Sequence, residues 1–286
     1  MVIAMARLED TASLAAAEAD VARDAARRLD AVFQSGAGIF SILVVLLAWE
    51  LFARSGRVTP FMLPAFSVVL ARIYTDAVGG DLWINLGLTI YRAMAGFAIA
   101  TIGGITLGAL MSRSKIARWF FDPIISVGFP MPKIAFLPII MLWFGLYDFS
   151  KISIVVFDAI FPVVTATLGG IASVDKELIW SARNMGANKR EVLTQIVLPA
   201  ALPQIMTGLQ VALPLTLIVA VVAEMLMGGY GLGGAMMTAS RFANSPGVFA
   251  GIVEIAVVGY VLVKAMSMLR RRLLIWHQEA NEPSTA

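Results

Sequence analysis

The stretch that decides the fold runs from Asp175 to Pro203 and has the sequence DKELIWSARNMGANKREVLTQIVLPAALP. It is a polar interruption between two long apolar segments, and it is too long and too regular for an ordinary turn. Both of its halves place apolar residues at helical spacing, at Leu178, Ile179, Ala182, Met185, Val192, Leu193, Ile196 and Val197. This pattern predicts two short amphipathic helices, which the chain's own apolar domain holds on one side and a partner binds on the other.

The ends of these two helices carry boundary signals. Gly186 is expected to end the first helix, because glycine is common where helices terminate. Asn188, followed by Glu191 three residues later, resembles a capping box at the start of the second helix, with Asn in place of Ser or Thr. Pro199 is expected to stop this second helix, since proline cannot donate the next backbone hydrogen bond.

The spacing of four residues in this stretch matches a known motif. Gly186, Ile196, Leu198 and Pro199 form the pattern G-x9-I-x-L-P, which resembles half of the EAA loop in permease subunits of bacterial ATP-binding cassette (ABC) importers. In that family the loop is the coupling helix, which docks in a groove of the ATPase subunit. The Glu-Ala-Ala of the motif falls on residues 180–182, which are Trp-Ser-Ala, so only the last alanine matches. The alternative is a cytoplasmic loop that packs only on its own domain.

The composition defines the class of protein. Of the 286 residues, 59% are hydrophobic and 14% are charged, and the mean hydropathy is +0.83. A soluble domain has a more polar surface, so we predict an all-α integral membrane protein embedded in lipid. The absence of cysteine excludes disulfides and thiolate metal sites. No basic stripe is interleaved with aromatic residues, so a nucleic-acid partner is not supported.

Apolar segments predict about six transmembrane helices, each close to the twenty residues that a bilayer requires. They lie at residues 36–53, 87–111, 123–145, 152–172, 207–227 and 248–268. Together they define a permease domain at residues 36–272, with the coupling loop at 175–203. Residues 1–35 are predicted to form a cytoplasmic helical leader, because they lack the apolar core of a signal peptide. Residues 273–286 are predicted to be a flexible cytoplasmic tail.

The second predicted span carries small residues at four-residue spacing: Gly96, Ala100, Gly104 and Gly108. Such a stripe lets another helix approach closely in lipid, where packing replaces the hydrophobic effect. We expect the stripe to pack within the chain; a contact between two copies is the alternative.

The third predicted span is rich in proline, with Pro123, Pro130, Pro132 and Pro138. So many prolines must bend or break a transmembrane helix, and the freed carbonyl groups then need partners inside the protein or in water. Broken helices near the middle of the membrane often mark a transport path. Pro130 and Pro132 are therefore candidates for the translocation path.

The same span resembles a stretch of the permeases for sulfonate, taurine, nitrate and bicarbonate, whose pattern is P-x-P-x-x-A-x-x-P-(L/I)-x-x-x-W-F-G. The matching residues are Pro130, Pro132, Ala135, Pro138, Ile139, Trp143, Phe144 and Gly145. Lys133 lies inside this stretch. It is interpreted either as a charge that attracts anions near the pore or as a lysine that extends to the cytoplasmic mouth.

Two carboxylates lie in or beside predicted spans. Asp158, in the fourth span, is a candidate for the translocation path or for a structural hydrogen bond, because a carboxylate is costly in lipid. Glu224, at the end of the fifth span, is interpreted as a gate, an interhelical residue or an interfacial carboxylate. The following GGYGLGG at residues 228–234 lacks the Lys-Ser/Thr of a phosphate-binding loop and is expected to be a flexible outer connection.

The distribution of positive charges predicts the orientation. Fourteen lysines and arginines lie on the side of the N-terminus: Arg7, Arg23, Arg27, Arg28, Arg113, Lys115, Arg118, Lys176, Arg183, Lys189, Arg190, Arg270, Arg271 and Arg272. Five lie on the other side: Arg54, Arg57, Arg72, Lys151 and Arg241. This bias places both termini and the coupling loop in the cytoplasm, in a multi-pass protein of the bacterial inner membrane.

The resemblance implies a function in transport. It implies a homodimer of permeases, two ATPase subunits in the cytoplasm and an extracytoplasmic solute-binding protein, with this chain forming the path of a small solute such as a sulfonate, taurine, nitrate or bicarbonate. The residues expected to couple to the ATPase are Leu178, Ala182, Met185, Gly186, Ala187, Lys189 and Arg190. The alternatives are an ion-driven secondary transporter and a membrane scaffold without transport activity.

We expect no enzyme activity in this chain, because the sequence contains no Walker motif, no nucleophile elbow and no metal-ligand cluster. No cofactor is expected on this chain. ATP and Mg²⁺ are expected on the partner ATPase.

Overall fold

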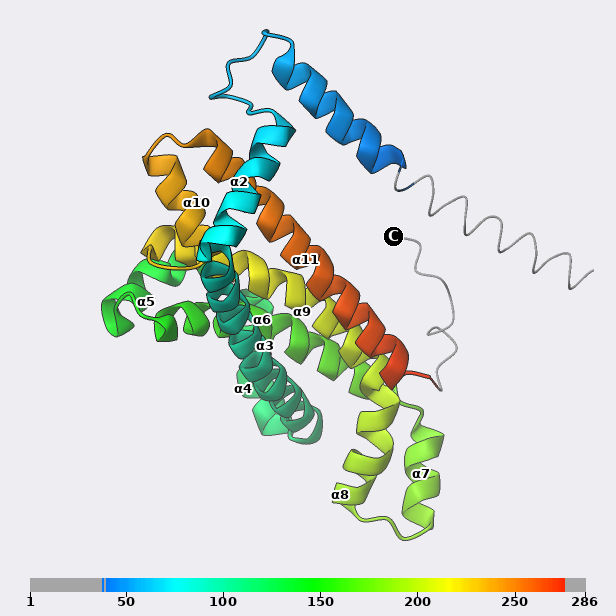
Figure 1. Ribbon diagram of the computed structural model, residues 1–286. Helices are drawn as coiled ribbons and strands as arrows, with labels where there is room; N and C mark the ends of the chain where they lie inside the picture. The colour runs from blue at the N-terminus through cyan, green and yellow to red at the C-terminus, as the bar shows by residue number, and fades with distance from the viewer. Residues whose placement is uncertain (1–37, 39, 276–286) are drawn as a thin grey trace, which may run out of the picture. The chain divides into compact units, whose positions relative to one another are not determined.

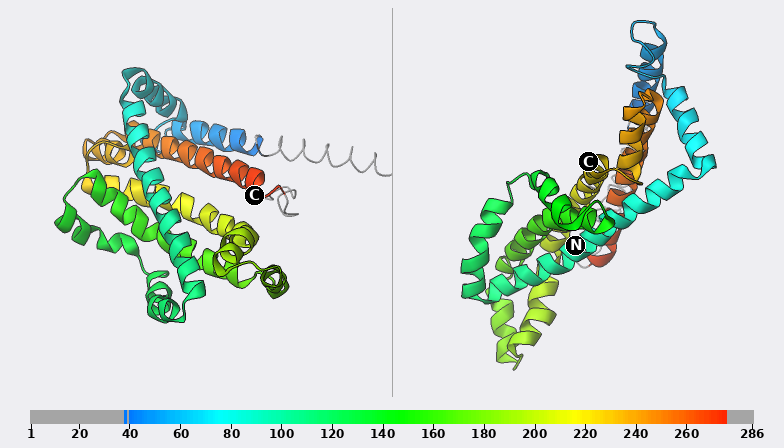
Figure 2. Two further views of the ribbon diagram at one scale, coloured as in Figure 1. Left: turned by 90° about the horizontal axis from the view of Figure 1, so that it is seen from below. Right: turned by 90° about the vertical axis from the view of Figure 1, so that its left-hand side faces the viewer.

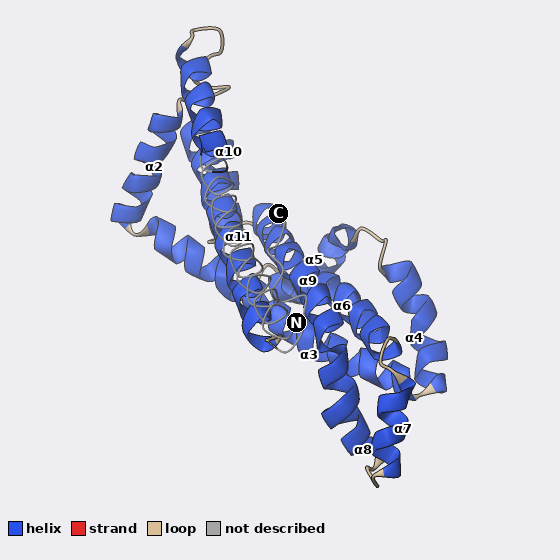
Figure 3. Ribbon diagram, turned by 90° about the vertical axis from the view of Figure 1, so that its right-hand side faces the viewer, coloured by secondary structure: helices blue, strands red, loops and turns tan. Residues whose placement is uncertain are grey.

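The structure is a computed structural model that describes residue 38 and residues 40–275. All regular structure in these residues is helical, as Figure 3 shows, which confirms the all-α class. The chain divides into two compact units, residues 1–68 and 69–286, and the boundary falls within helix α2 (Phe66–Gly79). The predicted leader and most of the predicted tail lie outside the described residues.

The first unit contains a helix at residues 40–54, which is the described part of the first predicted span. Most of its apolar side chains are exposed, as expected for a helix surrounded by lipid. Glu50 lies near its end, and the carboxylate accepts hydrogen bonds from Arg54 Nε (2.6 Å) in the same helix and from the backbone N–H of Ser67 (3.0 Å) in the first turn of α2. The indole of Trp49 donates to the carbonyl of Pro64 at 3.0 Å.

The second unit is a bundle of helices and short helical turns (Figure 1). After α2 come α3 (Asp81–Arg113), α4 (Lys115–Gly128), η1 (Lys133–Phe136), α5 (Leu137–Phe144), α6 (Asp148–Ala172), α7 (Lys176–Asn184), α8 (Lys189–Glu191), η2 (Val192–Val197), α9 (Leu198–Met227), α10 (Leu232–Arg241) and α11 (Ser245–Leu273).

Four helices in the described residues are long and apolar enough to cross a membrane: α3, α6, α11 and the continuous helix Lys189–Met227. The pair formed by α4 and residues Lys133–Phe144 adds a fifth if it counts as one broken span. The predicted total of six also includes the first span, of which the helix at residues 40–54 is the described part, so the total remains a prediction.

Helix α6 packs against α3 at the predicted stripe of small residues. A methyl group at Gly104 would lie 2.7 Å from Cβ of Val163, and one at Gly108 would lie 2.7 Å from Cβ of Thr167. Both distances are well inside van der Waals contact, so the two helices approach this closely only because side chains are absent. The stripe therefore packs within the chain, as predicted.

Helix α6 also packs against α9, and the two helices run side by side in both views of Figure 2. A methyl group at Gly170 would lie 3.0 Å from the carbonyl oxygen of Ala201, and one at Gly208 would lie 3.2 Å from that of Pro162. Helix α6 is thus held between α3 and α9 by close backbone approach, which is how helices associate in lipid.

The proline-rich span is broken, as its sequence predicts. Helix α4 and the segment η1–α5 are bent by 96° relative to each other. Pro130 and Pro132 lie in the break, whereas Pro123 lies inside α4 and Pro138 lies in the first turn of α5. The helix is interrupted where proline removes two backbone donors within three residues.

The predicted stop at Pro199 is wrong. The second helix of the coupling segment continues through this proline, so that Lys189–Met227 forms one helix of 39 residues. A π-helical turn, η2, precedes the proline, and the N–H of Leu198 donates to the carbonyl of Leu193, five residues back. Such a widened turn accommodates a proline within a continuing helix by changing the hydrogen-bond register.

The close approach of α3 and α6 predicts different effects for two adjacent glycines. Gly104→Ala should lower the free energy of unfolding by about 1–3 kcal/mol, because the methyl group overlaps the branched Cβ of Val163. Gly103→Ala is the control, since its methyl group would make an ordinary 3.5 Å contact with Ile160 and gains the same helix propensity. Thermal denaturation in detergent measures both variants, and equal midpoints would contradict this packing.

Candidate functional site

The coupling segment forms a helical hairpin of α7 and α8 at the end of α6 and α9 (Figure 1). Gly186 ends α7 in the left-handed conformation (φ 90°), as predicted, and donates its N–H to the carbonyl of Arg183 at 3.0 Å. The N–H of Ala187 reaches the carbonyl of Ala182 at 3.0 Å, which completes a Schellman motif. The predicted capping box is present at Asn188, whose side chain accepts from the N–H of Glu191 at 3.0 Å.

One face of the hairpin is buried against the rest of the second unit. Ala182 lies in the same apolar cluster as Val192 and Val197, and Ala187 packs against this cluster. Arg113, the last residue of α3, donates from Nη2 to the carbonyl of Lys189 at 3.2 Å. The hairpin is therefore fixed to the ends of the membrane helices.

Outside this buried face, the hairpin exposes both apolar and basic side chains. Met185 is 80% exposed, Trp180 is 58% exposed and Leu178 is 49% exposed. Lys189 and Arg190 are also exposed. Leu178 and Met185, seven residues apart, lie on one side of the hairpin, and Trp180 lies on another side of α7. Large exposed apolar residues of this kind are available for contact with a partner protein. Of the residues expected to couple, Ala182 and Ala187 thus support the hairpin from inside, because the Schellman turn folds them toward its second helix.

The structure brings two of the predicted path residues together. Lys133 begins η1 beside the helix break, and its Nζ lies 3.6 Å from Oδ1 of Asp158 in the middle of α6. The ammonium donates to the carbonyl of Phe129 at 2.8 Å. Lys133 therefore folds back onto the break and is paired inside the protein, and it does not extend to the end of the helix.

At the opposite end of α6 and α9, a buried charge network surrounds Glu224. This carboxylate is fully buried and accepts from Nη1 of Arg92 at 2.6 Å and from the hydroxyl of Thr89 at 2.8 Å. Arg92, which is 4% exposed, also pairs with Asp148 at 2.7 Å. The network links α3, α6 and α9, so Glu224 is the interhelical residue that one interpretation of the sequence expected.

The same network fixes the glycine-rich loop between α9 and α10 through its backbone. The carbonyls of Gly228 and Tyr230 accept from Lys151 Nζ (2.8 Å) and Arg92 Nη1 (2.6 Å). The N–H groups of residues 231–233 donate to Asn85, Thr89 and Glu224. The loop is therefore held at five backbone groups, whereas the sequence suggested a flexible connection.

Glycine is required at position 231 of this loop. Gly231 has a φ of 128°, and a methyl group there would overlap the carboxylate of Glu224. The loop lies this close to the buried charge because it has no side chain at that point.

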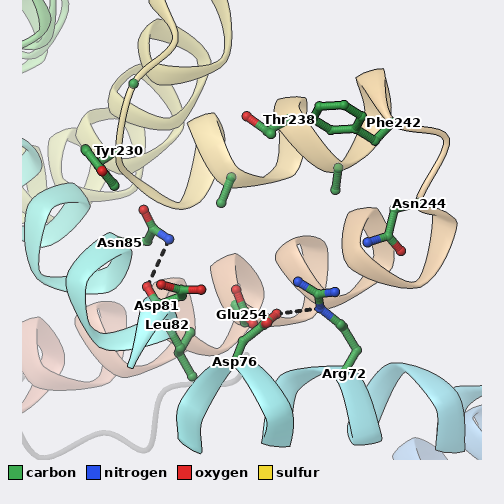
Figure 4. Close-up of a pocket in the computed structure, with 13 residues that line it drawn as sticks. Arg72, Asp76, Asp81, Leu82, Asn85, Tyr230, Thr238, Phe242, Asn244 and Glu254 are labelled. Atoms are coloured by element: carbon green, nitrogen blue, oxygen red, sulfur yellow. Dashed lines mark hydrogen bonds and ion pairs between the residues drawn. The ribbon is translucent and has the colours of Figure 1, made fainter. Parts of the chain in front are cut away.

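A pocket of about 550 Å³ lies beside this loop, between α2, α3, α10 and α11 (Figure 4). Three carboxylates line it, those of Asp76, Asp81 and Glu254, against one guanidinium, that of Arg72. Arg72 is paired with Asp76 at 2.8 Å. The lining is thus negatively charged.

Comparison with known proteins identifies the family. Residues 100–275 match the family described as binding-protein-dependent transport system inner membrane component. The chain belongs to this family of transport permeases. It is 34% identical over 246 residues to the taurine transport system permease protein TauC of Escherichia coli (strain K12), which covers 84% of this chain and 90% of TauC. It is 32% identical over 239 residues to the putative aliphatic sulfonates transport permease protein SsuC of Bacillus subtilis (strain 168), covering 84% and 87%.

Solved structures show the same fold. The permease aligns with a chain of a bacterial ABC transporter involved in the import of the acidic polysaccharide alginate, with a TM-score of 0.59 and 17% identity over 86% of this chain and 99% of the other. It also aligns with a chain of the inward-facing MetNI methionine ABC transporter, with a TM-score of 0.57 and 19% identity. This alignment covers 68% of the permease and 95% of the other chain. The resemblance to permeases of ABC importers is confirmed, and an ion-driven carrier is not supported.

Sequence reasoning missed the buried cations of the network around Glu224 and the glycine-rich loop. Arg92 and Lys151 are charged residues within apolar helices, and charge at such a position by itself indicates a buried partner. That signal was available in the sequence, but the choice of partner was not. Arg92 and Glu224 are 132 residues apart and meet only when α3 and α9 pack.

The buried network predicts a large effect of removing its central cation. Arg92→Met should lower the free energy of unfolding by about 3–5 kcal/mol, because it leaves the carboxylate of Glu224 buried without its ionic partner. Arg72→Met is the control, since it removes a partly exposed i,i+4 ion pair and should change this energy by about 1 kcal/mol or less. Thermal denaturation of both purified variants measures this difference in stability. A similar loss of stability in the two variants would contradict the role of Arg92 as the buried partner of Glu224.

Proposed function

We propose that this permease forms a homodimer, and that it imports a small sulfonate-type solute together with two ATPase subunits and an extracytoplasmic binding protein. The family is defined by binding-protein-dependent transport. Relatives at 34% and 32% identity are named for taurine and aliphatic sulfonate transport, which supports this substrate class. The stoichiometry is what the resemblance of the chain to permeases of ABC importers implies. No catalysis is assigned to this chain, and ATP and Mg²⁺ bind to the partner ATPase.

The hairpin α7–α8 is the docking element for the ATPase, and its exposed face is the observation that carries this assignment. Met185, Trp180 and Leu178 supply apolar contact, while Lys189 and Arg190 supply polar contact. Trp180 stands where the family motif has glutamate, so apolar contact takes the place of an acidic one. The excess of cations on this side of the protein supports a cytoplasmic location for the hairpin and both termini.

The permease transmits movement of the hairpin along rigid helices. The helix Lys189–Met227 has 39 residues and thus extends over about 60 Å, from the hairpin to Glu224 and the glycine-rich loop. ATP binding closes the ATPase dimer and draws the two hairpins together. Each α9 carries this movement to the opposite end of the bundle. The permease then opens to the outside of the membrane by a rigid-body change.

The binding protein docks at this opposite end, beside the network around Glu224. Tyr230 is 71% exposed on a loop whose backbone is fixed at five points. Exposed aromatic side chains on a rigid support are typical centres of protein interfaces. Phe242 is exposed at the adjacent pocket (Figure 4).

Reconstitution tests the proposed function. The permease, the ATPase encoded beside it and the binding protein are placed in proteoliposomes, and ATP hydrolysis and taurine uptake are measured. We expect both to depend on ATP and on the loaded binding protein, and uptake to persist when ion gradients are dissipated. Uptake that needs an ion gradient and no ATP would contradict the proposal.

The hairpin surface predicts the effect of a single charge. Met185→Glu should abolish copurification of the ATPase and its stimulation while leaving the denaturation midpoint unchanged, because the residue is exposed and makes no core contact. Met185→Leu is the control, since it conserves apolar volume and should retain at least about half of the activity. Normal stimulation in the glutamate variant would show that the ATPase binds elsewhere.

A further inference from the structure

The ion pair of Lys133 and Asp158 differs in geometry from the two ion pairs of Arg92. Arg92 contacts its two carboxylates at 2.6 and 2.7 Å, whereas Lys133 Nζ lies 3.6 Å from Asp158. Charge-assisted hydrogen bonds are normally close to 2.8 Å. The Lys133–Asp158 pair is therefore in electrostatic contact without a direct hydrogen bond.

Each partner of this pair has unused hydrogen-bonding capacity. Lys133 donates to the carbonyl of Phe129, and an ammonium group has three N–H donors. Within the described residues the carboxylate of Asp158 has the lysine as its charged partner and receives no hydrogen bond. Their side chains are 10% and 13% exposed, respectively, so the pair is mostly buried.

The pair lies beside the broken helix, about halfway along α6. Asp158 lies on the part of α6 that meets η1, one turn before Pro162, whose carbonyl faces α9. Phe161, also on α6, contacts the pair: Lys133 Nζ lies over its ring, 5.0 Å from the ring centroid. Ionisable residues beside a broken helix, halfway along a span, indicate a solute or ion pathway.

The geometry points to a binding site for a zwitterionic solute, in which Lys133 binds an anionic group and Asp158 binds an ammonium group of the same molecule. This inference rests on the proposed function and narrows its substrate class to aminoalkanesulfonates. A simple anion would draw Lys133 away from Asp158 and leave an unpaired carboxylate in a poorly solvated site, which is costly. A zwitterion replaces the loose pair by two charge-assisted hydrogen bonds and leaves neither residue unpaired.

Equilibrium binding to the purified permease, without the binding protein, tests this site. The two probes are 2-aminoethanesulfonate (taurine) and ethanesulfonate, which have the same carbon chain and sulfonate and differ by the ammonium group. Wild type should bind taurine about tenfold or more tightly, because a site built to bond a substrate amine rejects the analogue that lacks it. Equal affinity for the two probes, or no binding of either, would overturn the inference.

Variants separate the two roles. Asp158→Asn should reduce the affinity ratio of taurine to ethanesulfonate to about one, and Lys133→Met should weaken the binding of both. The double variant Lys133→Met/Asp158→Asn removes both charges, so it should retain the fold and bind neither probe. An unchanged ratio in Asp158→Asn, or binding by the double variant at the wild-type level, would contradict the site. Lys264→Met, which changes an exposed lysine on α11, is the control and should leave the ratio unchanged.

The same preparations separate this inference from the proposed function. If the reconstituted complex imports taurine with ATP, but Asp158→Asn leaves the affinity ratio of taurine to ethanesulfonate unchanged, the binding site is refuted and the proposed function is not. Complexes that bind taurine with the expected ratio but fail to couple uptake to ATP would refute the proposed coupling alone.

Discussion

The close approach of α6 to α3 and α9 is the constraint on which the second unit depends. Lipid is as apolar as the helix surfaces, so burial of leucine or valine gives little drive for helix association, and packing contacts must supply it. Glycines at the two interfaces allow backbone and Cβ atoms to meet at distances that an added methyl group would not permit. Because α6 is fixed between α3 and α9, both of its ends have defined positions relative to these two helices.

Those two ends carry different chemistry. At one end, the helices α6 and α9 enter the hairpin, whose inner face packs on the membrane domain and whose other side chains, apolar and basic, are exposed. At the other end, Arg92 joins Glu224 and Asp148, and the glycine-rich loop lies on this network. Between the two ends, Asp158 pairs with Lys133 beside the broken helix. The elements assigned to ATP coupling, solute passage and docking thus share one central helix.

Local signals in the sequence identified much of this structure. The hairpin boundaries follow from Gly186 and Asn188, because capping depends on residues within one helical turn. The stripe on α3 and the break near Pro130 follow equally from local spacing and from the chemistry of proline. The sequence also carried the two motifs of the permease family, so the class of protein followed from it.

Other features depend on contacts that a local rule does not describe. Pro199 fails to stop its helix because a π-helical turn changes the hydrogen-bond register before it. Ala182 shares helical spacing with exposed Met185, yet the turn after α7 folds Ala182 inward. The pairing of Arg92 with Glu224 joins residues 132 positions apart. The sequence revealed that these charges need partners but did not reveal which partners.

The central claim is that the hairpin moves with the ATPase and carries that movement through the permease. The chain contains no cysteine, so Thr194→Cys accepts a single spin label; Thr194 is exposed in η2, directly after α8, and is not one of the proposed contact residues. The distance between the labels on the two permease copies is then measured by pulsed electron paramagnetic resonance in the full complex, with and without a non-hydrolysable ATP analogue. We predict that the distance distribution shifts to shorter values when the nucleotide binds. An unchanged distribution in a complex that hydrolyses ATP would contradict the account.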